Sequence, residues 1–406
     1  MHDLVRMSRL MTTALRRAAT ATVLAAAALA LARMVVTPSK EKLEIRTGAD
    51  ASRVRAALAA FVASRAWREG YAPAWVMRWW WCGAFEGSVS TILHHVARTP
   101  LAERPFRTAY ARELVRTRDG GQIGLDWHRA RDRAASELAA TAPVVIVQHG
   151  LTGSSESTYV RHAVPRLLAA GFRVVVLVAR GCGGVELRTP SGFTAHRTDD
   201  HRDAVEHVQR KYPRAPLFGV GYSLGAGLLL KYLGEEGAAS PLRGAVAVSP
   251  SFDFHIKPAH FELWSRYRLV DGLKEWARKN RERLAHPKLD FERVLASVDV
   301  REFDTHAVVP VYGFSSVDEY YEASSAIRVA HDITTPTLAL CAADDPVCSA
   351  DGVPRLPEAF GPGLAVLVTR RGGHVGFASG FWGTESFMDD VVEDFLKACR
   401  EAEAAP

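Results

Sequence analysis

Cysteine is scarce in this 406-residue chain, and its five copies follow no pairing pattern. They are odd in number and widely spaced, and no CxxC pair occurs, which argues against a disulfide framework and against a structural zinc site. The sequence alone does not place Cys341 and Cys348 close enough for a bridge, so none is expected there. We predict a protein without disulfides and without a metal.

A strong charge of one sign is also missing. The chain has 51 basic and 45 acidic residues, and part of its net charge of +6 comes from arginines near the N-terminus, namely Arg6, Arg9, Arg16, Arg17 and Arg33. No zinc-finger spacing and no basic helix with heptads is present, so nucleic acid is not an expected partner. Walker and dinucleotide-binding patterns are absent as well, and no cofactor is predicted. The 48% of hydrophobic residues indicates a folded globular protein.

Residues 1–40 form the predicted targeting segment, in which Ala18 to Ala32 is an uncharged run preceded by arginines. Three interpretations fit it: a signal peptide, an organelle transit peptide, or a membrane anchor that continues past Arg33 into Met34–Val36. An alanine-rich surface helix or a disordered leader is the simpler alternative. The prediction is membrane association through this segment, with a cytoplasmic, secreted or organelle-targeted protein as the alternatives.

Residues 41–104 are predicted to be an N-terminal helical extension. It contains the aromatic cluster Trp79–Trp81, a pattern that is typical of core packing and also occurs at membrane interfaces. Packing is the favoured interpretation.

From about Phe106 onward, short apolar runs alternate with amphipathic stretches. Such runs, separated by helical patterns, predict buried parallel strands in a doubly wound α/β sheet; they lie at 144–147, 174–178, 217–220, 245–248, 337–341 and 364–368. Two of the intervening helices are expected at Thr198–Tyr212 and Ala226–Leu233. The predicted catalytic domain covers 105–402, and the charged, aromatic stretch at about 252–332, helical at Leu273–Leu284, is predicted to be a lid over the strand ends.

Ser223 lies in the pattern Gly221-Tyr222-Ser223-Leu224-Gly225, which follows an apolar strand and opens a helix of small residues. This strand–turn–helix context is the one that a nucleophile elbow needs, and the flanking glycines permit the tight turn. Ser223 is therefore the predicted nucleophile of a serine hydrolase.

A serine nucleophile needs a base, and the base needs an orienting acid. Asp344-Asp345 and His374 follow Ser223 in that order, each just after a predicted strand. Asp345 is the preferred acid because Pro346 holds its backbone extended, whereas Asp344 is expected to cap the loop. Asp253 is a third, weaker candidate.

The oxyanion hole needs two backbone N–H donors. Leu224, directly after the nucleophile, and Leu151, in the turn after the first parallel strand, are the predicted donors, and His149 is expected to brace that turn. The loop of Arg180 and Cys182 is predicted to support the site, with Arg180 in a structural ion pair and Cys182 not acting as a nucleophile.

Several stretches together resemble the α/β-hydrolase group that includes the ABHD1/ABHD3-type membrane hydrolases, the YheT-like bacterial hydrolases and plant embryogenesis-associated esterases. The similar stretches are 119–127, 149–154, 180–184, 301–304, 320–325, 344–346 and 372–377. The resemblance implies the α/β-hydrolase fold, an acyl-ester hydrolase with the triad Ser223, Asp345 and His374, and a single-pass N-terminal anchor. Val178 and Ser349 depart from the family pattern, where asparagine and proline are usual.

The predicted function is hydrolysis of acyl esters, including phospholipid or other lipid esters, through an acyl-enzyme. Two alternatives remain open at this stage: a catalytically silent lipid-binding or interaction protein, and an acyltransferase, although no HxxxxD pattern occurs. The expected partners are a small-molecule or lipid ester and a membrane surface. The identity of the ester and the oligomeric state do not follow from the sequence.

Overall fold

The computed structural model describes residues 40–41, 43–74, 86–103, 109–129, 138–258, 261 and 265–404. Met1–Ser39 and Lys40–Pro406 are two separate units, and the account below concerns the second. The predictions for the targeting segment and for Trp79–Trp81 fall outside the described residues.

A mostly parallel sheet forms the centre of the described fold. It has nine strands in the order β1-β9-β8-β7-β6-β4-β5-β3-β2: β1 (Glu44–Thr47), β2 (Ala109–Arg116), β3 (Gln122–Arg129), β4 (Val144–Gln148), β5 (Arg173–Val178), β6 (Leu217–Tyr222), β7 (Leu242–Val248), β8 (Thr337–Ala342) and β9 (Leu364–Thr369). Strands β4 to β9 run parallel to one another, and they are the six predicted apolar runs.

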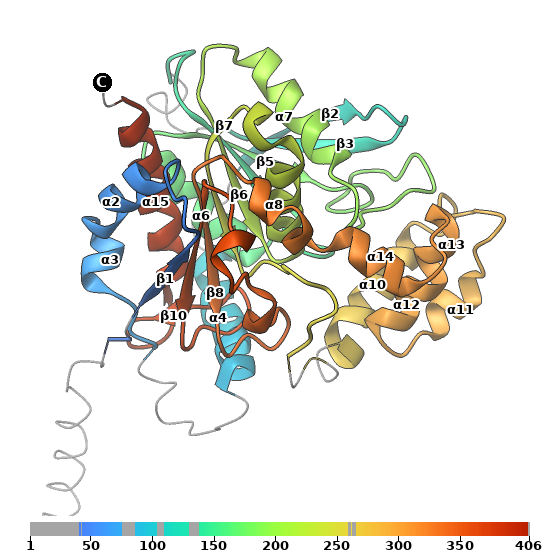
Figure 1. Ribbon diagram of the computed structural model, residues 1–406. Coiled ribbons are helices and arrows are strands. Elements are labelled where there is room, and N and C mark those ends of the chain that lie inside the picture. Colours follow the sequence, from blue (N-terminus) through green and yellow to red (C-terminus); the bar gives the residue numbers. More distant parts are fainter. Residues whose placement is uncertain are drawn as a thin grey trace, which may run out of the picture. The chain divides into compact units, whose positions relative to one another are not determined.

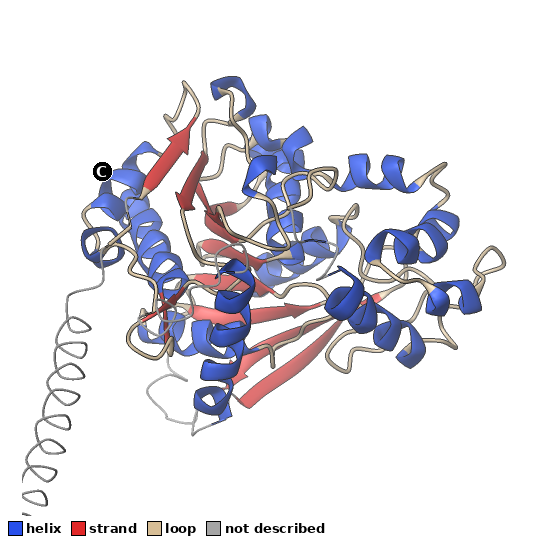
Figure 2. Ribbon diagram, turned by 90° about the horizontal axis from the view of Figure 1, so that it is seen from below, coloured by secondary structure: helices blue, strands red, loops and turns tan. Residues whose placement is uncertain are grey.

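Helices cover both faces of this sheet (Figures 1 and 2). On one face α2 (Arg55–Val62), α6 (Thr158–Ala169) and α15 (Phe387–Ala404) bury their apolar side chains, and on the other α7 (Asp199–Lys211) and α8 (Leu224–Glu236) do so. Side chains of a strand alternate between the two layers: Val145 and Val147 of β4 pack into the first, Val144 and Ile146 into the second. Both faces are therefore buried, which explains why these strands read as continuous apolar runs.

The N-terminal extension is not purely helical, and in this respect the prediction was wrong. Its first element, β1, pairs antiparallel with β9 at the edge of the main sheet, α2 packs on α15, and α3 (Arg65–Glu69) follows. The long helix α4 (Glu86–Glu103) is tied to α15 by a 2.5 Å ion pair between Arg98 and Asp389, both buried. The extension thus builds one side of the same folded unit.

The predicted lid lies between β7 and β8. Its helices are α10 (Val270–Lys279), α11 (Phe291–Ala296), α12 (Val300–Ala307), α13 (Val309–Tyr312) and α14 (Val317–Ser324), and Figure 1 shows them gathered on one side of the sheet. They enclose small apolar clusters of their own, centred on Leu273 with Phe303 and on Tyr320 with Tyr321. In the portion of the chain that the structure describes, no helix has the length and apolar character needed to cross a membrane.

Candidate active site

Ser223 occupies a sharp turn between β6 and α8. Its backbone has φ 54° and ψ −122°, a region that non-glycine residues rarely enter and that marks strain at functional sites. A Cβ atom at Gly221 would lie 2.6 Å from Cα of Ala226, and one at Gly225 would lie 2.5 Å from the carbonyl oxygen of His149. Only glycine fits these positions, so the flanking glycines permit the turn that exposes the serine hydroxyl.

The structure brings Ser223, His374 and Asp345 together. Nε2 of His374 lies 2.8 Å from Oγ of Ser223, and Nδ1 lies 2.9 Å from Oδ2 of Asp345. Oδ1 of Asp345 also accepts hydrogen bonds from the backbone N–H groups of Val347 and Cys348, both at 2.8 Å. With the imidazole proton on Nδ1, His374 donates to the carboxylate and accepts from the serine hydroxyl, which is the arrangement that activates a serine.

The environment of His374 raises its basicity. Burial lowers the pKa of His374, but the charge and hydrogen bond of Asp345, together with the neighbouring Cys348, outweigh burial, so the pKa is raised above its ordinary value. A more basic imidazole is a better acceptor for the serine proton.

The other two aspartates predicted as alternatives make different contacts. Oδ1 of Asp344 accepts from the N–H of Gly373 at 2.9 Å, so Asp344 ties its own loop to the loop of His374. Oδ1 of Asp253 accepts from the N–H of His255 at 2.8 Å in a local turn. Among the described residues, Asp345 alone of the three hydrogen-bonds to the imidazole of His374.

Helix α4, in the N-terminal extension, holds the loop of His374, which the sequence did not predict. Oγ1 of Thr91 accepts from the N–H of His374 at 2.8 Å and donates to the carbonyl of Gly87 at 2.8 Å. Ser90 donates to the carbonyl of Gly372 at 3.1 Å. Gly87 itself is packed so closely that a Cβ atom there would overlap the backbone of Asp344. The helix therefore contacts the loops of both the acid and the base.

The two predicted oxyanion donors lie beside Ser223. A Cβ atom at Gly150 would be 3.0 Å from Cβ of Ser223, which places the turn of Leu151 against the nucleophile. Leu151 and Leu224 line the same cavity as Ser223. In the described part of the chain neither of their N–H groups has a hydrogen-bond acceptor, as is usual for the first residue of a helix such as Leu224.

His149 connects two loops at the strand ends. Its Nδ1 donates to the carbonyl of Gly150 at 2.7 Å, and its Nε2 accepts from the N–H of Ala179 at 3.1 Å. Burial lowers the pKa of His149 to about 4, so the ring stays neutral. The N–H of Gly150 is in turn held by the hydroxyl of Tyr159, 2.9 Å away. His149 thus braces the turn that carries Leu151.

The loop after β5 is structural in its contacts. Arg180, nearly buried, forms ion pairs with Asp119 at 2.7 Å and with Asp200 at 2.5 Å. Burial raises the pKa of the Cys182 thiol to about 12, which disfavours the thiolate. Cys341 and Cys348 are free thiols.

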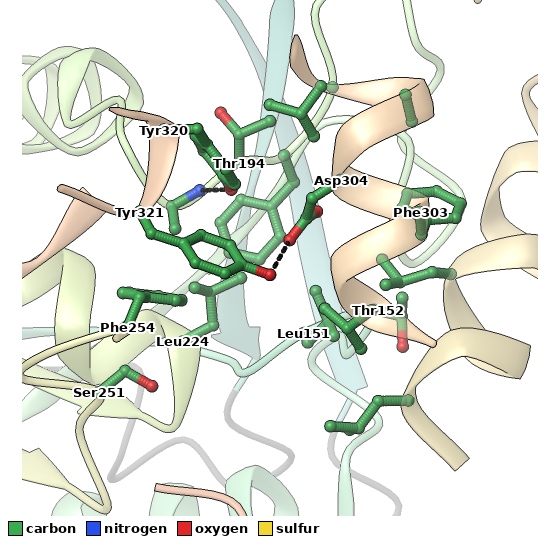
Figure 3. A pocket seen from close by; sticks show the side chains of 18 of the residues that line it. Leu151, Thr152, Thr194, Leu224, Ser251, Phe254, Phe303, Asp304, Tyr320 and Tyr321 are labelled. Atoms are coloured by element: carbon green, nitrogen blue, oxygen red, sulfur yellow. Dashed lines mark hydrogen bonds between the residues drawn. The ribbon is translucent and has the colours of Figure 1, made fainter. Parts of the chain in front are cut away.

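Ser223 opens into a cavity of about 160 Å³ between the strand ends and the lid. Its walls are mainly apolar and aromatic, and they include Leu151 and Leu224 as well as lid residues such as Phe291 and Phe303. Figure 3 shows part of this lining, with Leu151, Leu224 and Phe254 along one side. In the residues that the structure describes, no group of three His, Cys, Asp or Glu side chains gathers as a metal site.

Comparison with known proteins identifies the family. The family model of serine aminopeptidase S33 (Hydrolase_4) matches residues 139–368. Phospholipase ABHD3 of Mus musculus is 33% identical over 310 residues, covering 73% of this chain and 75% of that protein. The chain belongs to the ABHD3-type α/β-hydrolase family.

Other relatives of this ABHD3-type hydrolase come from Picea glauca and Escherichia coli. Embryogenesis-associated protein EMB8 of Picea glauca is 33% identical, covering 66% of this chain and 61% of that protein. Putative esterase YheT of Escherichia coli is 30% identical, covering 70% and 84%. Membership in this family makes the chain a carboxylic ester hydrolase, and it confirms the fold class and the resemblance seen in the sequence.

Proposed function

We propose that this ABHD3-type hydrolase cleaves lipid acyl esters through an acyl-enzyme formed on Ser223. The observation that carries the proposal is the continuous chain of contacts from Ser223 through His374 to Asp345, which opens into an apolar cavity. The names of two relatives, a phospholipase and a putative esterase, agree with ester substrates.

In the proposed reaction, Oγ of Ser223 attacks the ester carbonyl while Nε2 of His374 takes its proton. The carboxylate of Asp345 stabilises the imidazolium that forms. The N–H groups of Leu151 and Leu224 donate to the developing oxyanion. His374 then gives the proton to the leaving alcohol, and a water activated by the same imidazole releases the acid and restores Ser223.

The lining of the cavity supports a lipid as the substrate. Each CH₂ group removed from water contributes about 0.8 kcal/mol, so an apolar cavity of this kind favours an alkyl chain over a short polar acyl group. Aromatic side chains from the lid make up much of the wall. The exact chain length depends on small differences in apolar fit, which discriminate weakly.

Replacement of the nucleophile tests the proposal. Ser223→Ala is expected to abolish turnover of p-nitrophenyl esters and labelling by a fluorophosphonate probe, while the circular dichroism spectrum stays unchanged. Ser240→Ala is a matched control, because Ser240 lies just before the N-terminal end of β7, whereas Ser223 follows the C-terminal end of β6. Ser240 accepts a hydrogen bond from the N–H of Leu242, and its variant should keep both properties. Persistence of turnover and labelling in Ser223→Ala would contradict the proposal.

We also propose that residues 18–36 tether the protein to a membrane, on the strength of the uncharged run Ala18–Ala32 and of Met34–Val36, which continue the apolar stretch past Arg33. The full chain should then sediment with membranes and resist extraction by alkaline carbonate. The double variant Leu24→Asp/Leu29→Asp places two charges in the run and should release the protein. A shortened N-terminus with protein in the medium would indicate a signal peptide instead.

A further inference from the structure

Asp304, on the lid helix α12, is a buried acid in the wall of the same cavity. It is 8% exposed, and it lines the cavity together with Ser223 and Leu151. Its partner in the described structure is Tyr321 of α14, whose hydroxyl donates to Oδ2 at 3.1 Å. Figure 3 shows the two side chains pointing toward one another, joined by this hydrogen bond.

No basic side chain in the described part of the lid forms an ion pair with Asp304. Arg301, one turn earlier on α12, pairs instead with Asp318 at 2.7 Å, and Lys257 lies over the ring of Phe261 at 5.3 Å. A buried carboxyl without a cation is costly. Burial accordingly raises the pKa of Asp304 to about 7, against the opposing hydrogen bond from Tyr321. An apolar residue at a purely structural position would be less costly to bury than this carboxyl. We therefore favour a role of Asp304 in binding the substrate.

The surroundings hold this carboxyl in place and leave it as an available acceptor. Tyr321 packs against Tyr320 and Phe254, with ring centroids 5.6 and 5.8 Å apart. The hydroxyl of Tyr320 is already used, since it accepts from the N–H of Ala195 at 3.2 Å. Tyr321 occupies Oδ2 of Asp304, and a carboxyl group has further acceptor positions on its other oxygen.

We propose that Asp304 is a specificity-determining residue that accepts a hydrogen bond from a donor group, a hydroxyl or a protonated amine, carried by the ester substrate. This inference rests on the proposed function and narrows it to esters with such a donor. Tyr321 acts as a positioning residue that fixes the carboxyl. A site built to accept a hydrogen bond discriminates against a substrate without the donor, because its buried acceptor is then left unpaired.

The test uses the full chain and four decanoate esters. Propyl decanoate is the reference; 3-hydroxypropyl decanoate and 3-(dimethylamino)propyl decanoate carry the donor on the alcohol side, and propyl 10-hydroxydecanoate carries it on the acyl side. The measured quantity is kcat/KM of each donor ester divided by kcat/KM of the reference. For the wild type we expect at least one ratio of about 10 to 100, the range for a hydrogen bond to a charged group. Comparing the ratio for the hydroxyl ester with that for the amine ester shows which donor group Asp304 prefers.

Asp304→Asn keeps the size of the side chain, and it distinguishes substrate recognition by Asp304 from a purely structural role. Tyr321 would donate to the amide oxygen, leaving an NH₂ group toward the substrate, so the ratio measured for the preferred donor ester should fall to about 1. Asp318→Asn, which alters an exposed aspartate of the neighbouring helix α14, is the matched control and should keep the wild-type ratio. If Asp304 had only a structural role, Asp304→Asn would lower kcat/KM for all four esters together and leave their ratios unchanged.

Two results would overturn the inference: wild-type ratios near 1 for every donor ester, or a ratio above 10 that Asp304→Asn leaves unchanged. Failure of the proposed function is distinguishable, because the wild type would then not hydrolyse propyl decanoate either.

Discussion

At the scale of single residues, Asp344 and Asp345 are neighbours in the chain with different partners. The side chain of Asp345 holds the imidazole of His374, whereas that of Asp344 holds the backbone N–H of Gly373. Because only the first contact fixes the tautomer of the base, the two carboxylates should differ in their effect on the reaction.

Asp345→Asn is expected to lower kcat by about 10³- to 10⁴-fold, since an amide favours the wrong imidazole tautomer. Asp344→Asn keeps an oxygen that can accept from Gly373 and should cost less than tenfold. Steady-state rates on a p-nitrophenyl ester measure both. The assignment of the acid would be reversed if Asp344→Asn proved the more damaging change.

The raised pKa of His374 sets the pH dependence. Only the neutral imidazole accepts the proton of Ser223, so activity is lost as pH falls through the pKa of His374. Because Asp345 raises that pKa, the acid limb of kcat/KM should have its midpoint above the ordinary value of about 6.5. In Asp345→Asn the attraction disappears while burial remains, so the pKa should fall below that of the wild type.

Titration of the His374 ring protons by NMR, in the wild type and in Asp345→Asn, checks the direction independently of turnover. Equal pKa values in the two proteins would show that the carboxylate does not control the base.

At the scale of elements, α4 connects the N-terminal extension to the reacting groups. Thr91 is the one side chain of the described part of α4 that hydrogen-bonds His374 directly. Its oxygen both accepts from the loop and donates back to the helix. This contact predicts that a helix of the N-terminal extension affects the rate of the reaction.

Thr91→Val keeps the shape of the side chain but leaves the N–H of His374 without its acceptor. The expected result is a fall in kcat of about tenfold, equivalent to about 1.4 kcal/mol, with KM nearly unchanged. Thr91→Ser, which retains the hydroxyl, should restore most of the rate. Equal kcat values for the valine and serine variants would contradict a positioning role.

The elements also show what could be predicted from the sequence. Strands β4 to β9 have both faces buried, so each is a continuous apolar run that is easy to recognise. In contrast, β1 and β2 lie at the edges of the sheet, and β2 (AYARELVR) mixes charged and apolar residues. Their assignment depends on pairing with distant residues, as in the contact of Glu44 with Val368, which no local pattern contains.

The same distinction applies to the site. Ser223, Asp345 and His374 each follow a recognisable strand, and because these strands are parallel, their carboxyl ends bring the three residues together. Thr91 and Asp304 lie on helices whose local sequences carry no signal of the cavity or the loop that they contact. Their roles depend on how α4 packs against α6 and how α12 packs among the lid helices, and this is decided by tertiary contacts.

At the scale of the whole molecule, Arg180 links three segments that are distant in the sequence. Its guanidinium pairs with Asp119, in the turn between β2 and β3, and with Asp200 at the start of α7. Burial raises the pKa of Asp200, although the attraction of Arg180 opposes this rise. The pKa of Asp119 is lowered instead: burial would raise it, but hydrogen bonds, including the one from Arg180, outweigh burial. Asp200 thus depends on this arginine for its charge, whereas Asp119 also pairs with Arg197 at 3.0 Å.

Arg180→Met should therefore destabilise the fold far more than the loss of a surface ion pair. Removing one partner of a buried pair leaves an uncompensated charge and costs about 3–5 kcal/mol. Arg210→Met is the matched control, because Arg210 is 69% exposed and pairs with Glu206 at 3.7 Å; exposed pairs contribute only about 0–1 kcal/mol. Urea unfolding of the three proteins at neutral pH gives both differences. A loss below about 1 kcal/mol in Arg180→Met would mean that Asp119 and Asp200 find other partners or water, and that this network does not hold the edge of the sheet.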